Sequence, residues 1–276
     1  MFKATSIIVF VSVAFSTYAQ TPREIVDSMF YKTNELKGFI AVINKTERFE
    51  EEYVIQKSLV KLNRDPIKIY IRQLMPKEGI EVLVDSARYR KAIVNLNSFP
   101  WVNLYLDPQG IFMRKNQHHT VYDSGFDLMT SILKIELRSN NPKQSLVRKD
   151  DTEWNGQKMF KLILSNNDYK LIDYTVKNGE TVDDIADRFK INGYSILELN
   201  DDVNGYSDVE TGQIIKIPNH YAKTMELHID QTTFLPLVIK VFDYKGLYEK
   251  YEYNSININP FFAEDEFTEE FEHYNF

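Results

Sequence analysis

The sequence predicts an α+β protein whose main part is a single curved antiparallel sheet, a half-barrel with helices on its concave face. First, Ile67, Ile69 and Ile71 alternate with polar or aromatic residues, which is the period of a strand with one buried face. Second, segments of this kind follow one another through short turns, which favours antiparallel hairpins over helical crossovers. Third, Tyr (17) and Phe (18) far outnumber Trp (2), and such aromatic side chains are typical of sheet faces.

Residues 1–19 have the composition of a signal peptide. Lys3 precedes an apolar run at residues 7–15, and the small residues Thr17 and Ala19 allow cleavage before Gln20. An N-terminal membrane anchor is the alternative, but the run is too short to span a bilayer comfortably. The sequence contains no cysteine, so it offers neither a disulfide nor a site for lipoprotein acylation. We therefore expect a secreted, periplasmic protein.

Two helices are expected outside this leader. Thr21 and Glu24 have the spacing of a capping box, with Pro22 at the first helical position. The second helix is predicted over residues 126–137, where apolar side chains recur at helical spacing. Both helices are expected to lie against the sheet.

The remaining regular segments have the pattern of strands. They are expected at residues 39–46, 53–63, 67–72, 80–85, 92–96, 102–106, 159–164, 225–229, 234–242 and 248–253. Residues 173–218, here called the module, interrupt this pattern where a hairpin tip would join two neighbouring strands. Because exposed hairpin tips tolerate insertions, we interpret the module as a small domain inserted into a discontinuous body of residues 20–171 and 221–276.

Within the module, the sequence predicts the order strand, helix, helix, strand. Residues 174–176 form a β-branched and aromatic run that ends at the turn Asn178-Gly179. Thr181 can cap a helix whose first turn carries two aspartates, which the positive helix end favours. The other two elements are a short helix at residues 194–199 and a strand at residues 214–217, which Pro218 ends.

Six short motifs of the module stand in the order of a known family. They are Tyr174-Thr175-Val176, Gly179-Glu180-Thr181, Ile185-Ala186, Leu199-Asn200, Gly212-Gln213 and Ile217-Pro218. Together they closely resemble the LysM domain, a small glycan-binding module. Glu180 replaces the commoner Asp and Val182 stands where Leu is usual, and both changes are mild.

The LysM resemblance implies a groove for N-acetylglucosamine-containing glycan, most simply peptidoglycan. By position, one wall of the groove would be Asn178, Gly179, Glu180, Thr181 and Val182, and the other would be Leu199, Asn200, Asp201 and Val203. Backbone amides of the turn can donate hydrogen bonds to an N-acetyl carbonyl, while Val182 and Leu199 can pack against its methyl group. Thr181 has a competing role as a helix cap, and both roles can hold.

The body carries looser motifs of a second family. They are the helix from Pro22, the strands around residues 68–72 and 79–85, Thr232-Thr233-Phe234-Leu235-Pro236, Tyr251-Glu252-Tyr253, Asn259-Pro260 and Phe267. This pattern is similar to the LolA/LolB type of outer-membrane lipoprotein carrier and to uncharacterised secreted domains with the same layout. The resemblance implies an apolar ligand such as a lipid or a lipoprotein acyl chain. Residues that could line its cavity, or fill an ordinary core instead, are Phe39, Tyr70, Phe126, Phe160, Phe242 and Tyr251.

The net charge of −7 lies mostly in the module, which has ten acidic and four basic residues. Such a surface disfavours nucleic acid, so we expect no nucleic-acid partner and a glycan bound through hydrogen bonds and apolar contacts. A second acidic cluster is interpreted as a solvated tail. It consists of Glu264, Asp265, Glu266, Glu269 and Glu270.

His118-His119, with Asp123 nearby, is the most conspicuous group of ionisable residues. Adjacent strand residues point to opposite faces and the spacing indicates no third ligand, so we expect no metal and interpret the pair as part of a solvated loop. His228 is expected to face solvent. The motifs of serine hydrolases, zinc peptidases and phosphate-binding loops do not occur, so no catalytic residue and no cofactor are predicted.

These observations predict a non-catalytic cell-envelope protein whose module binds peptidoglycan or a related glycan and whose body binds lipid or lipoprotein. The main alternative is a hydrolase that remodels cell wall or polysaccharide and is delivered to its substrate by the module. Forty acidic residues are too many for the sequence to nominate a catalytic carboxylate pair. A third interpretation is a platform for protein partners with a filled core.

Overall fold

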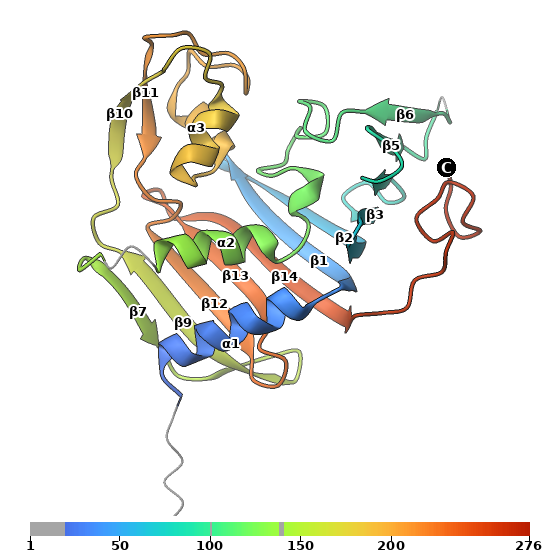
Figure 1. Ribbon diagram of the computed structural model, residues 1–276, viewed down its shortest axis with the longest axis horizontal. Coiled ribbons are helices and arrows are strands. Elements are labelled where there is room, and N and C mark those ends of the chain that lie inside the picture. The colour runs from blue at the N-terminus through green and yellow to red at the C-terminus, as the bar shows by residue number, and fades with distance from the viewer. Residues whose placement is uncertain (1–19, 100, 138–140) are drawn as a thin grey trace, which may run out of the picture.

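The computed structural model describes residues 20–99, 101–137 and 141–276 of the chain (Figure 1). The expected signal peptide, residues 1–19, lies outside the described residues. Within the described ranges, no helix is both long enough and apolar enough to cross a membrane.

Twelve antiparallel strands form one open, curved sheet, which confirms the predicted α+β class (Figure 1). The order across the sheet is β6-β5-β4-β3-β2-β1-β14-β13-β12-β9-β7, and β8 pairs with β9. The strands are β1 (Gly38–Phe49), β2 (Glu52–Arg64), β3 (Ile67–Met75), β4 (Glu81–Asp85), β5 (Ala92–Asn95), β6 (Asn103–Leu106), β7 (Gln144–Arg148), β8 (Thr152–Trp154), β9 (Gln157–Asn166), β12 (Thr224–Asp230), β13 (Pro236–Phe242) and β14 (Leu247–Ile258). Since β6 and β7 stand at opposite ends of this order, the sheet does not close into a barrel.

Strands β1 and β14 lie in the middle of the sheet and position the site described below. Their pairing shifts register between Ile40 and Val42, a bulge of the kind that bends a strand. Further along the same pair, Glu47 lies directly opposite Glu249. Two like charges at opposed positions repel each other, so this pair requires cationic partners.

Helices α1 (Pro22–Glu35) and α2 (Asp127–Glu136) lie across one face of the sheet (Figure 1). The predicted capping box at the start of α1 is present, because the backbone N–H of Thr21 donates to Glu24 Oε2 over 2.8 Å and Thr21 Oγ1 accepts from the Glu24 N–H. Each helix buries an apolar stripe on the sheet: Ile25, Val26 and Met29 from α1, and Met129, Ile132 and Leu133 from α2. A short 3-10 turn, η1 (Val121–Asp123), precedes α2.

The module has its own two-stranded sheet and its own core. Its elements are β10 (Leu171–Thr175), α3 (Val182–Phe189), α4 (Gly193–Leu199) and β11 (Ile214–Pro218), in the predicted order. Val182, Ile185 and Ile196 are fully buried in a cluster separate from the core of the body. The module lies between β9 and β12, which pair directly with each other. The division of the chain at residues 171 and 221 stays a prediction.

The C-terminal segment corrects the expectation of a solvated acidic tail in part, since Glu264, Asp265 and Glu270 are exposed but Glu266 is not. Glu266 is buried, and its carboxylate lies 2.7 Å from the Lys61 ammonium. Phe267 is 3% exposed, and the ring of Tyr274 stacks on Tyr70 at 3.7 Å between centroids. Aromatic residues spaced among the acidic ones fasten this segment onto the sheet, so charge alone was a poor guide to its exposure.

Candidate functional site

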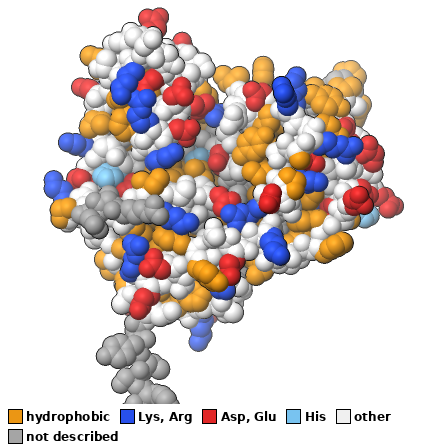
Figure 2. All heavy atoms as spheres, viewed as in Figure 1, with side chains coloured by type: hydrophobic (Ala, Val, Ile, Leu, Met, Phe, Trp, Pro, Cys, Tyr) orange, Lys and Arg blue, Asp and Glu red, His pale blue; other side chains and the backbone are white. Residues whose placement is uncertain are grey.

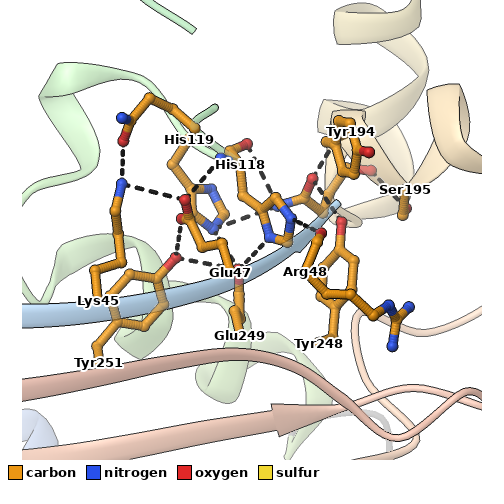
Figure 3. Close-up of polar contacts among 12 residues, drawn as sticks. Lys45, Glu47, Arg48, His118, His119, Tyr194, Ser195, Tyr248, Glu249 and Tyr251 are labelled. Atoms are coloured by element: carbon orange, nitrogen blue, oxygen red, sulfur yellow. Dashed lines mark hydrogen bonds and ion pairs between the residues drawn. The ribbon is translucent and has the colours of Figure 1, made fainter. Parts of the chain in front are cut away.

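The candidate site lies where the body meets the module, around a loop that runs from β6 to η1 (Figure 3). This loop carries His118 and His119, while β1 supplies Glu47 and β14 supplies Glu249 and Tyr251. Glu249 and Tyr251 are two residues apart on a strand, so both side chains point to the same face of the sheet. Three segments that are distant in the sequence thus converge on one buried polar cluster.

Glu249 is the centre of this cluster and is fully buried. Its Oε2 lies 3.1 Å from His118 Nδ1 and 3.0 Å from His119 Nε2, and its Oε1 accepts a 2.5 Å hydrogen bond from the Tyr221 hydroxyl. Burial alone would raise the pKa of Glu249, but the two imidazoles outweigh it and hold that pKa well below its usual range. The carboxylate is therefore ionised in the folded protein.

His118 is held in a single orientation by both of its ring nitrogens. Its Nε2 lies 2.7 Å from the carbonyl oxygen of Arg48, which can only accept, so Nε2 carries a proton. The ring stacks between Tyr248 and Tyr194, at 4.3 Å and 5.0 Å between centroids. His118 is 4% exposed, so the expectation of a solvated loop is wrong. The loop turns inward because Glu47 and Glu249 need positive partners there.

Glu47 is the second buried carboxylate and has partners of its own. The Lys45 ammonium lies 3.2 Å from its Oε2, and the Tyr251 hydroxyl donates to its Oε1 over 2.8 Å. Burial would raise the pKa of Glu47, but Lys45 and the two histidines lower it overall. The paired carboxylates on β1 and β14 are thus neutralised by an ammonium on one side and imidazoles on the other.

Three residues of the cluster could also hold a metal ion. One ligand atom each from Glu47, His118 and Glu249 lie within 4.8 Å of one another. Oxygen and imidazole ligands suit divalent ions such as Zn²⁺ or Mn²⁺. The spacing argument against a third ligand missed Glu47 and Glu249, because they come from strands about 70 and 130 residues away from the histidines. The same carboxylates also have Lys45, His118 and His119 as partners within the chain.

A cavity of about 170 Å³ adjoins this cluster on the body side. Its polar end is formed by Lys45, Gln117 and His119. Its apolar wall includes Ile43, Val60, Ile71, Val82 and Tyr253. Of the aromatic residues considered as cavity lining, only Tyr251 lines this cavity; Phe39, Phe126 and Phe160 are core, Tyr70 lies under the C-terminal segment, and Phe242 does not line it. A lining of this kind suits a small ligand that has an apolar part and a polar part.

The module is fastened to the body next to this cavity. Asn192 caps α4, and its Oδ1 accepts hydrogen bonds from the Tyr194 N–H and the Tyr248 hydroxyl at 2.8 and 3.2 Å. The Asn192 amide nitrogen also lies 3.3 Å from His119 Nε2. Near the C-terminal end of α4, the Glu198 carboxylate lies 3.6 Å from the Arg48 guanidinium. A helix cap of the module is therefore part of the buried cluster.

The first predicted wall of the glycan groove lies partly at the surface. Asn178 and Gly179 are exposed, and Gly179 has a positive φ of 74°, which favours glycine at this turn. The Glu180 carboxylate folds back to accept from the Tyr174 hydroxyl at 2.7 Å. Thr181 caps α3 as predicted, with its Oγ1 accepting from the Asp184 N–H at 3.2 Å. Val182, in contrast, is fully buried.

The second wall also has an inner and an outer part. Asn200 and Val203 are buried, and the Asn200 side chain braces the loop by donating to the carbonyl of Lys216 at 2.9 Å. Leu199 is half-buried and Asp201 is exposed. The predicted groove residues thus separate into reachable positions and positions that hold the walls in place, and their role in glycan binding stays a prediction.

Two further histidines are engaged within the body. His228 is partly buried on the face of β12 opposite Leu227 and Ile229, and it is engaged there: its Nε2 lies 2.8 Å from Glu226 and its Nδ1 lies 3.0 Å from the Thr152 hydroxyl. His220 lies 3.1 Å from Glu136 and 3.2 Å from Asp168, close to the end of the module. Glu226 lies two residues before His228 on β12, whereas Thr152, Glu136 and Asp168 come from distant segments that strand alternation does not reveal.

Comparison with protein families gives two matches. The family model of the LysM domain matches residues 174–218. The family model described as "Protein of unknown function (DUF1571)" matches residues 36–185, which is more than half of the chain. No curated protein sequence matches the chain.

Solved structures similar to the chain have low sequence identity to it. The lipoprotein LppX of Mycobacterium tuberculosis is 11% identical, with a TM-score of 0.43 over 87% of this chain and 97% of that one. A LolA superfamily protein of Nitrosomonas europaea is 10% identical, with a TM-score of 0.34 over 91% and 98%. MucB is 11% identical, with a TM-score of 0.41. The match covers 90% of this chain but only 62% of the length of MucB. The expected resemblance of the module to the LysM domain is confirmed, and the structures similar to the chain include a LolA superfamily protein.

Proposed function

The chain belongs to the DUF1571 family of proteins of unknown function, and we propose that it is a non-catalytic protein of the cell envelope that holds a small amphiphile near a glycan polymer. The observation that carries this proposal is the match of the LysM model to residues 174–218. The module supplies attachment to the glycan and the body supplies the ligand cavity. Export through residues 1–19 is part of the proposal.

The glycan partner is peptidoglycan or another polymer that contains N-acetylglucosamine. The exposed turn at Asn178 and Gly179 presents backbone groups, and Leu199 and Asp201 stand at the reachable part of the opposite wall. A single small site of this kind binds weakly. A polymer offers many such sites close together, so the protein would stay near it through repeated binding.

The body is proposed to hold one acyl chain with a polar end. Its cavity of about 170 Å³ is smaller than the roughly 300–1,000 Å³ of typical ligand pockets, so a single chain fits better than a multiply acylated lipoprotein. Lys45 and His119 at the polar end are already paired with carboxylates, and Glu47 and Asp123 also line the cavity, so an uncharged polar head group suits it better than an anionic one. The apolar side chains of Ile43, Val60 and Val82 are suited to the hydrocarbon.

Extraction and mass spectrometry of the purified protein test the body, with a variant that fills the cavity. Ile71 lines the cavity, so Ile71→Trp should remove a co-purifying amphiphile, whereas Val147→Trp on the exposed edge strand β7 should retain it. Absence of any amphiphile from the unaltered protein would contradict the carrier proposal.

Sedimentation with purified sacculi tests the module. The protein should pellet with sacculi and release no soluble fragments from them. Failure to pellet would contradict glycan attachment. Release of fragments would contradict the non-catalytic assignment and favour a wall-remodelling hydrolase.

A further inference from the structure

A second and larger cavity lies between the module and the body. It is a crevice of about 570 Å³, within the size range of ligand sites. One side is formed by residues 111–116 of the loop that follows β6, and the other by α4 and by Asn204, Gly205 and Tyr206 of the module. Phe49, at the end of β1, closes its base.

The loop that follows β6 separates this crevice from the cavity of the body. Met113 and Gln117 line the body cavity, whereas Phe112 and Lys115 line the crevice. Figure 1 shows this loop, in green, passing close to α3 of the module. The body therefore contributes a wall to a cavity that also belongs to the glycan-binding module.

Large apolar side chains are left open to solvent at this crevice. Phe112 is 80% exposed and Ile111 is 60% exposed, and they line the crevice together with the half-buried aromatic residues Tyr194 and Tyr206. Figure 2 shows that hydrophobic side chains also reach the surface of the neighbouring sheet edge, to the right of the module. Aromatic rings in a crevice offer flat apolar faces that can pack against the apolar face of a sugar ring.

The same wall carries two cations. Arg114 Nη1 lies 2.8 Å from Asp183, and its guanidinium lies 4.0 Å from the centre of the Tyr206 ring. The Arg114 side chain is 9% exposed, and its Nε–H has no hydrogen-bond partner among the described residues. A buried donor without an acceptor is costly, and a ligand oxygen would satisfy it. Lys115 is exposed and forms no ion pair within the described ranges.

The crevice adjoins the predicted glycan groove through the backbone. Asn204 follows Val203, the last predicted residue of the groove, and the Val182 N–H donates to the carbonyl of Tyr206 at 2.9 Å. A glycan strand bound in the groove could therefore extend into the crevice. Arg114 and Lys115 in the crevice would attract negatively charged substituents of the glycan, which the strongly acidic module itself would repel.

We propose that this crevice is a second subsite, which binds the carboxylate-bearing peptide substituent of a glycan strand whose sugar is held by the module. This inference rests on the proposed function of the module. It makes the binding site composite, because Phe112, Arg114 and Lys115 come from the body. It also assigns specificity: the protein should prefer peptide-substituted glycan over a plain N-acetylglucosamine oligomer.

Titration calorimetry of the full chain with two probes tests this proposal. The probes are chitotetraose, which has no carboxylate, and a soluble muropeptide, which has several. Phe112→Ser and Lys115→Glu should each weaken muropeptide binding by roughly fivefold and leave chitotetraose binding unchanged. Matched controls are Phe261→Ser, at a residue that is 94% exposed on the C-terminal segment, and Lys149→Glu, at an exposed lysine after β7.

The possible results distinguish the second subsite from glycan binding by the module. Weaker muropeptide binding in the crevice variants alone supports the second subsite. If both probes bind and the crevice variants match their controls, the second subsite is wrong and the proposed function of the module stands. If neither probe binds the unaltered protein, glycan binding by the module is wrong, and the subsite falls with it.

Discussion

The module and the buried cluster of the body are built in opposite ways. The module takes its turn, its helix cap and its core from one continuous stretch of the chain. The cluster takes Glu47, His118, Asn192 and Glu249 from four segments, and each is held by the others. A local motif tolerates loss of one member, whereas a buried set of charges does not, because every removal leaves another charge unpaired.

The largest effect should follow from neutralising the centre of the cluster. Glu249→Gln removes the charge that His118 and His119 both face, so we expect the free energy of unfolding to fall by about 3–5 kcal/mol. Urea unfolding followed by circular dichroism measures this change. Glu252→Gln, on the same strand but paired with Lys250 near the surface, should cost less than about 1 kcal/mol. Equal losses in the two variants would mean that the cluster has no special role.

The second prediction concerns a residue that lies only in the core of the module. Ile185 is fully buried there, and Ile185→Ala should cost about 2–5 kcal/mol of stability. Because the two cores are separate clusters, the loss should be confined to the module. Hydrogen exchange should show faster exchange in β10, α3 and β11 with unchanged protection in β1 and β14. Uniform loss of protection across the chain would show that the module and body unfold as one unit.

The sequence predicted the module far better than it predicted the cluster. Thr181, Gly179 and Ile185 act on neighbours within a few residues, so a local pattern reveals their roles. The alternation of Ile67, Ile69 and Ile71 likewise revealed a strand, since the period of a strand is a local property. Both kinds of prediction rest on interactions or periods among residues that are close together in the chain.

The buried cluster could not be predicted, because it depends on which residues the pairing of β1 with β14 places opposite each other. Nothing near Glu47 in the sequence indicates that Glu249 lies opposite it, about 200 residues later. Without that pair, His118 and His119 have no visible reason to be buried. The one available signal was Glu249 within the predicted strand 248–253, because a carboxylate buried in a sheet requires a partner, but the sequence does not say which one.

The third prediction tests the contact between the two regions. Asn192→Ala removes the cap of α4 together with the hydrogen bond from Tyr248, so it should cost about 1–2 kcal/mol. It should also speed hydrogen exchange at His118 and His119, which lie in the body. Asn204→Ala, at an exposed asparagine of the module, should change neither quantity by a measurable amount. An effect of Asn192→Ala on the module alone would mean that the two regions are not coupled through this residue.

The smallest effect should appear as a dependence of stability on pH. Burial would lower the pKa of His119, but the Glu249 carboxylate outweighs it and raises that pKa above its usual value of about 6.5. The resulting stabilisation is fully present below about pH 6.5 and is lost as the pH rises through the pKa of the folded state, because the folded protein then gives up its extra proton. Urea unfolding from pH 6 to pH 9 should therefore show a shallower decline for His119→Gln than for the unaltered protein. A residual slope is expected from His220, whose pKa Glu136 raises.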